Sequence, residues 1–175
     1  KNYYSRQGKI TPFLEVREEL AKFRLKHRAY QASEDLYYDT LVHIHKSVSA
    51  QKRVLDTIPN TISQIYHIAE RVESEAIKII GHKLSILYYH LNWDYDKSLE
   101  LCTHLEENYL NRANSEIKVD LNQKRIVFIK LYAYIYTEEV IEGIPYAKRK
   151  QALFKTSHND WFTFMEYYIL LLFKA

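Results

Sequence analysis

Glycine and proline are scarce in this sequence, which has three of each among 175 residues. An all-β or α/β fold of this length needs many tight turns and often glycine-rich phosphate loops, so the scarcity argues against both fold classes. The chain is nevertheless long enough to bury a substantial core. It is therefore predicted to form long helices with few connections.

Long apolar runs, cysteine pairs and clustered charge are also lacking. The longest apolar run, 161–173, falls short of the ~20 residues that cross a bilayer and contains Glu166. The one cysteine, Cys102, excludes an internal disulfide and is expected to be a small core residue. Basic residues exceed acidic ones by three, and only 148–150 form a tight basic run. We expect a cytoplasmic protein with no membrane partner, and no nucleic-acid partner through this segment.

Signatures of catalysis are missing as well. The sequence has no His-Glu-x-x-His, no paired cysteine ligands, no glycine-rich phosphate loop and no Gly-x-Ser-x-Gly elbow. Its closest histidine pair, His43 and His45, would point about 200° apart on a helix and could not share an ion. The segment is therefore expected not to be an enzyme and to need no metal or other cofactor.

Apolar residues recur instead at the three-and-four spacing of helix faces. Ser33 is expected to cap a second helix and Pro59 to open a third, whereas Gly143 and Pro145 are expected to break the chain. The predicted helices cover approximately 12–31, 33–48, 58–72, 77–91, 95–109, 115–136, 146–154 and 160–173, and they pair as hairpins over 12–48, 58–91, 95–136 and 146–175. The apolar stripes of the first three predicted helices keep nearly the same phase around the helix axis. The pattern therefore does not decide whether these helices are separate or continuous.

A short tyrosine string repeats along the chain. Leu36-Tyr37-Tyr38, Leu87-Tyr88-Tyr89, Leu131-Tyr132 and Tyr167-Tyr168 recur at periods typical of helical-hairpin arrays. Around the second of these, residues 84–99 resemble a tetratricopeptide repeat, and the best match lies around 77–110. The resemblance implies an all-α fold of antiparallel helical hairpins, stacked as an α-solenoid or tetratricopeptide-like right-handed superhelix.

In that family, small residues let paired helices approach closely, and an aromatic residue after the turn packs back on the first helix. Ser85 and Ser98 would take the small positions and Tyr95 the aromatic one. The sequence departs from the pattern because Asn92 replaces the usual turn glycine and Trp93 looks like an inserted residue. The label tetratricopeptide-like therefore suits it better than the strict repeat.

A stack of hairpins offers a concave surface along which peptides can lie. The first reading is therefore a scaffold that binds a protein or peptide without catalysis. Lys130, the lone charge on an apolar helix, and Arg125 are predicted to hold a carboxylate, with Tyr89 and Tyr134 as flat contacts. In the alternative reading Lys130 extends to solvent and the tyrosines belong to the core.

Two further functions remain open. The segment could be a sensor or regulatory part of a larger, even DNA-binding, protein, because it begins at Lys1 without an initiator methionine and looks like a fragment of a longer chain. It could also be a self-assembly module that forms a homodimer through its last helix. The predicted assembly surface is Trp161, Phe164, Tyr168 and Leu172.

Overall fold

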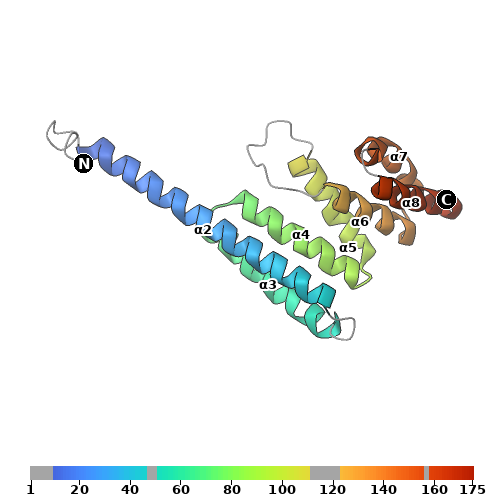
Figure 1. The fold of residues 1–175 in the computed structure, drawn as a ribbon, viewed down its shortest axis with the longest axis horizontal. Coiled ribbons are helices and arrows are strands. Elements are labelled where there is room, and N and C mark those ends of the chain that lie inside the picture. Colours follow the sequence, from blue (N-terminus) through green and yellow to red (C-terminus); the bar gives the residue numbers. More distant parts are fainter. Residues whose placement is uncertain (1–9, 47–50, 111–122, 156–157) are drawn as a thin grey trace.

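The fold is all-helical, as predicted. A computed structural model describes residues 10–46, 51–110, 123–155 and 158–175, and these ranges contain no strand (Figure 1). The α-helices are α2 (Ile10–Lys46), α3 (Gln51–Arg71), α4 (Glu75–Leu91), α5 (Tyr95–Leu105), α6 (Gln123–Tyr136), α7 (Val140–Lys150) and α8 (His158–Lys174). A π-helical turn, η1 (Glu106–Leu110), extends α5, and a 3-10 turn, η2 (Gln151–Phe154), follows α7.

Each helix packs against the next along the chain, and helices α2, α4, α6 and α8 also contact one another in that order. Thus α4 contacts α2 and α6 as well as its sequence neighbours α3 and α5, and α6 contacts α8. Helices α2, α4, α6 and α8 consequently form one row, with α3 and α5 behind it (Figure 1).

Three hydrophobic clusters run along this row. The first joins α2, α3 and α4 around Ile65 and Ile77, and the second joins α4, α5 and α6 around Ile86 and Leu105. The third lies among α5, α6, α7 and α8. Because α4, α5 and α6 each contribute to two clusters, the core continues from one end of the row to the other.

The predicted break between two helices near residue 32 is wrong. Helix α2 continues through it for 37 residues, so 12–48 is not a hairpin and α2 pairs with α3 instead. Ser33 does not cap a new helix: its buried hydroxyl donates to the carbonyl oxygen of Ala29 at 2.8 Å. A serine bonded back to the preceding turn sits inside a helix without ending it.

The two prolines and the glycine expected at helix boundaries lie inside helices. Helix α3 begins eight residues before Pro59, which is exposed on that helix. Gly143 and Pro145 both lie within α7. A Cβ at Gly143 would lie 2.6 Å from Leu171 Cδ2, so this glycine permits close helix packing and does not break the chain.

The turns before and after α4 have the same geometry. Glu73 and Trp93 adopt left-handed φ angles of 49° and 65°. In each turn the next residue donates its N–H to a carbonyl five residues back, from Ser74 to Ala69 and from Asp94 to Tyr89. This is the usual glycine-terminated helix end, made here without glycine. Trp93 therefore occupies the left-handed position of a repeated turn.

The best-predicted part is α4 with the start of α5. The predicted stripe 77–91 matches α4, and Ser85 and Ser98 are both buried. The Tyr95 ring packs back on α4, with its centroid 5.8 Å from that of His90. The predicted helix start at Ser115 lies outside the described residues.

Candidate functional site

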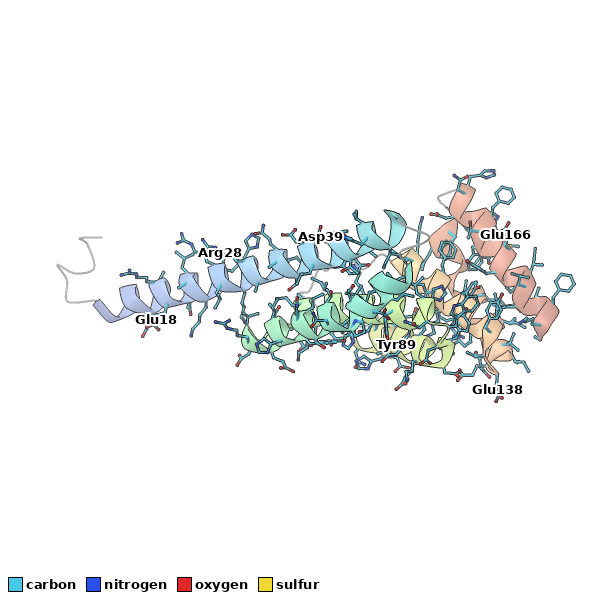
Figure 2. The ribbon with its side chains drawn as sticks, turned by 90° about the horizontal axis from the view of Figure 1, so that it is seen from below. Glu18, Arg28, Asp39, Tyr89, Glu138 and Glu166 are labelled. Carbon is cyan, nitrogen blue, oxygen red and sulfur yellow. The ribbon has the colours of Figure 1, made fainter. Side chains whose placement is uncertain are left out.

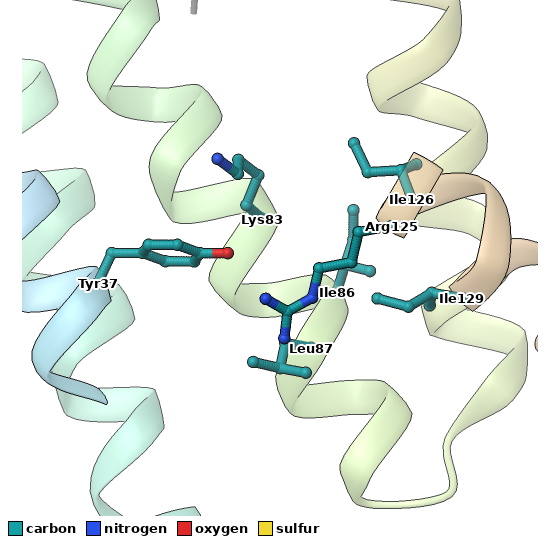
Figure 3. Close-up of a pocket in the computed structure, with 7 residues that line it drawn as sticks. All are labelled: Tyr37, Lys83, Ile86, Leu87, Arg125, Ile126 and Ile129. Atoms are coloured by element: carbon teal, nitrogen blue, oxygen red, sulfur yellow. The ribbon is translucent and has the colours of Figure 1, made fainter. Parts of the chain in front are cut away.

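A small pocket opens on the row of α2, α4 and α6. Tyr37 comes from α2, Lys83 from α4 and Arg125 from α6 (Figure 3). Apolar side chains complete the lining: Ile86, Leu87, Ile126 and Ile129. The pocket therefore combines two cations and a phenol with an apolar floor.

The polar groups of the pocket are close to one another. Lys83 Nζ lies 5.0 Å from the centroid of the Tyr37 ring, and the Tyr37 hydroxyl points toward the side where Arg125 lies (Figure 3). Burial raises the pKa of Tyr37, and the positive charge of Arg125 partly offsets this effect. Tyr37 is therefore a neutral hydrogen-bonding group between two positive charges, a combination suited to an anion.

The size of the pocket limits what can enter it. Its free volume of about 20 Å³ is room for about one water molecule. Substrates of drug-like size fill clefts of several hundred cubic ångströms. The pocket fits the tip of one side chain held from outside, and not a whole small molecule.

Lys130 lies away from this pocket, in the interior. Both Lys130 and Glu106 are about 5% exposed, and their Nζ and Oε2 atoms are 2.8 Å apart. The other carboxylate oxygen of Glu106 accepts from the Tyr146 hydroxyl at 2.8 Å and pairs with Lys150 at 2.9 Å. Lys130 thus neither extends to solvent nor faces a groove, and the carboxylate that it binds belongs to its own chain.

In the cluster of Glu106, Lys130, Tyr146 and Lys150, the Glu106 carboxylate is bound by two ammonium groups and a phenol of its own chain. Burial would raise the pKa of Glu106, but the hydrogen bonds from Lys130 and Lys150 outweigh it and hold that pKa below its ordinary value. Burial and the adjacent Glu106 carboxylate raise the pKa of Tyr146. Burial likewise raises the pKa of the neighbouring Cys102 thiol to about 12, which keeps it protonated. These groups thus bind one another within the fold.

The other predicted ligand-binding residues are dispersed. Tyr134 is buried and packs on Tyr146, with ring centroids 5.6 Å apart. Tyr89 is half-buried on α4, where Lys97 Nζ lies 5.2 Å from the centroid of its ring. Of the four predicted residues, Arg125 alone lines the pocket.

The predicted assembly surface on α8 is divided between core and solvent. Phe164 is 1% exposed and Trp161 and Tyr168 are half-buried, whereas Leu172 is exposed. The apolar residues that α8 does expose are Phe162, Ile169, Leu170, Leu172 and Phe173. Because the sequence of α8 is apolar on all sides, its pattern could not indicate which side α6 and α7 cover.

Sequence reasoning missed Lys83 and Glu106 as important charges. Lys83 is one of several charged or polar residues of α4, so it did not stand out as Lys130 did, and nothing in the sequence placed it beside Arg125. Glu106 is preceded by an apolar stripe and followed by Glu107, so it resembled an ordinary surface acid. Their roles depend on contacts between distant segments.

The described residues hold no group of three or more metal-ligating side chains, and none of their helices is long and apolar enough to cross a membrane. Comparison with protein-family models, with curated proteins and with solved structures finds no match to this chain. The resemblance to tetratricopeptide repeats therefore stays a prediction that rests on residues 84–99.

Proposed function

We propose that this chain is a helical-repeat scaffold of the α-solenoid type that binds a protein or peptide segment. An acidic side chain of that segment would enter the pocket of Tyr37, Lys83 and Arg125. The observation that carries the proposal is the convergence of two cations from separate helices over an apolar floor.

The arrangement of helices supports this reading. The pocket lies on the row formed by α2, α4 and α6, and in stacked hairpins one such row lines the surface along which a peptide lies. The pocket accepts a side-chain tip, so affinity would come from several such contacts along an extended segment. Catalysis is not part of the proposal, and neither is a cofactor.

A peptide array probed with the full chain tests the proposal. Each acidic peptide is paired with a version that carries Gln and Asn in place of Glu and Asp. We expect the acidic members to bind and their amide partners to bind about tenfold more weakly, because a charge-assisted hydrogen bond is lost. Equal binding of both members would contradict the proposal.

Variants locate the binding. Lys83→Gln and Arg125→Gln should each weaken binding of the selected peptides, whereas Lys155→Gln should not, because Lys155 is exposed on the segment after η2 and lies outside the pocket. Loss in all three variants would indicate a nonspecific effect of charge.

Self-assembly is a second candidate, favoured by the exposed apolar residues of α8. Phe173 is 85% exposed and Leu172 51% exposed. If this face joins two copies, Phe173→Glu should lower the mass that light scattering measures at high concentration. An unchanged monomeric mass in both proteins would argue against assembly through α8.

A further inference from the structure

The first half of α2 lies apart from the rest of the structure. Residues 15–28 are all exposed, and this part of the helix extends beyond the helices that cover its second half (Figures 1 and 2). Three of its apolar side chains are exposed to solvent: Val16 at 65%, Leu20 at 47% and Phe23 at 68% exposure. No other described helix covers this stretch of α2.

The exposed apolar residues continue an established interface. Val16, Leu20, Phe23, His27 and Tyr30 follow one another at alternating steps of four and three residues, the spacing of a helix–helix seam. Tyr30 already packs against the cluster formed by α2, α3 and α4. The uncovered stripe is thus the extension of the side of α2 that packs on α3 and α4.

The charges beside the stripe differ between its two flanks. Arg17, Arg24 and Arg28 fall within about 40° of one another around the helix. None of them has a carboxylate three or four residues away, where helical neighbours lie. The opposite flank mixes both signs: Glu15, Glu19, Lys22 and Lys26. One flank is therefore purely cationic, and the other is balanced.

A second copy of the chain fits this surface poorly. The helices that cover the second half of α2 would collide if two copies paired side by side in the same direction, so the pairing would have to be antiparallel. Placing Leu20 against Phe23 of a second copy then sets Arg17 against Arg24 of that copy. Like charges at that position oppose association.

We propose that residues 15–28 of α2 are a docking site for an amphipathic helix of a different protein. Its apolar side packs on Val16, Leu20 and Phe23, and its flank facing Arg17, Arg24 and Arg28 carries acidic residues. The site is separate from the pocket of Tyr37, Lys83 and Arg125.

Two synthetic peptides of about 21 residues test this site on the full chain by fluorescence anisotropy. Both have Leu along one helix stripe and Gln along one flank, and the other flank carries Glu in one peptide and Lys in the other. We expect the Glu peptide to bind about tenfold more tightly, as three close charge pairs would provide. Equal affinities would overturn the proposal.

Variants of α2 separate docking from folding. Leu20→Glu should abolish binding, whereas Leu25→Glu, on the opposite side of the same exposed helix, should leave it unchanged. The triple variant R17E/R24E/R28E should reverse the preference toward the Lys peptide, a result that simple unfolding cannot produce. Binding that survives Leu20→Glu, or an unreversed preference, would contradict the assignment.

Other occupants give different results. If the wild-type chain dimerises in light scattering and Leu20→Glu makes it monomeric, the occupant is a second copy and the proposal is wrong. A third outcome is that the wild-type chain binds vesicles of phosphatidylcholine and phosphatidylserine, that Leu20→Glu abolishes this binding, and that the chain does not distinguish the two peptides. The surface then binds membranes, and the proposal is again wrong.

Discussion

The two ends of the helix row have cores of different chemistry. Between α2, α3 and α4 every buried member of the cluster except Tyr37 is aliphatic. Among α5 to α8 the buried cluster contains Tyr134, Tyr146, Phe154 and Phe164, and the last two rings stack at 4.7 Å. Aliphatic stripes tolerate small shifts between helices, whereas large rings need specific spaces and partners for their hydroxyls.

The comparison explains why the aromatic end contains a buried charge cluster. The Tyr146 hydroxyl is buried and needs an acceptor, which Glu106 supplies, and the carboxylate in turn needs Lys130 and Lys150. The aliphatic cluster, by contrast, is held by packing. We therefore expect the aromatic end to be more sensitive to single polar changes.

The largest effect is expected from Glu106→Gln. This change leaves the buried Lys130 ammonium without a charged partner and should lower the free energy of unfolding by about 3–5 kcal/mol. Urea unfolding followed by circular dichroism measures it. Glu75→Gln is the matched control, since Glu75 pairs with Lys78 at an exposed position, and it should change stability little. Equal effects of the two variants would remove the distinction between the ends.

The same carboxylate predicts acid sensitivity. Because the folded-state pKa of Glu106 is lowered, its contribution is fully present above the unfolded-state pKa and is lost as the pH falls through the folded-state value. Wild-type stability should therefore fall with decreasing pH below about 4.3, the ordinary value for Glu. Glu106→Gln should show a shallower fall, and parallel curves would contradict this account.

Two glycine-to-alanine changes test the difference between the two ends of the row, with smaller expected effects on stability. A Cβ at Gly143 would meet Leu171 Cδ2 at 2.6 Å and Tyr134 Cβ at 2.8 Å, so Gly143→Ala should destabilise the protein by about 1–3 kcal/mol. At the aliphatic end, the three atoms nearest a Cβ at Gly81 all belong to the Tyr66 ring, the first of them at 2.9 Å. That ring can tilt, so Gly81→Ala should have the smaller effect in thermal unfolding.

The turn between α3 and α4 offers a stabilising change. Glu73 holds a left-handed φ of 49°, which glycine adopts without strain, so Glu73→Gly should raise stability by about 1 kcal/mol. Glu70→Gly, three residues earlier within α3, should lower it by about the same amount because glycine weakens a helix interior. The melting temperatures should thus move in opposite directions.

The smallest predicted effect is a pH dependence between α3, α4 and α5. Burial, and then the nearby His104, lower the pKa of His82, whose Nδ1 lies 2.9 Å from the Tyr66 hydroxyl. Glu75 opposes this shift, and Lys78 adds to it. Stability should therefore fall as the pH drops below about 6.5. His82→Asn should flatten that fall relative to His67→Asn, which changes an exposed histidine.

The sequence predicted the regular parts of the fold well. The stripe of α4 was correct because one face of that helix is apolar along its whole length, and the scarcity of glycine correctly indicated long helices. It predicted helix ends poorly at Ser33, Pro59 and Gly143. Each of these residue types ends helices in many proteins, and here the surrounding contacts made each compatible with a continuous helix.

The sequence did not indicate the candidate pocket. Its pattern singles out Arg125 as a ligand-binding residue, and Arg125 lines the pocket, but its companions Tyr37 and Lys83 lie far away in the sequence. Lys130 was singled out because it is the lone charge on an apolar helix. In the structure this charge is buried and paired with Glu106. A lone charge in an apolar pattern indicates an unusual environment but does not show whether the partner is internal or external.

By itself the sequence determined the helical content, the small number of turns and the amphipathic face of α4, because these depend on spacing within a few turns of chain. Only the tertiary structure decided which side of α6 and α8 is covered, which carboxylate meets Lys130, and which helices bring Arg125 to Lys83. These outcomes depend on burial and charge pairing between distant segments, and local periodicity carries no information about them.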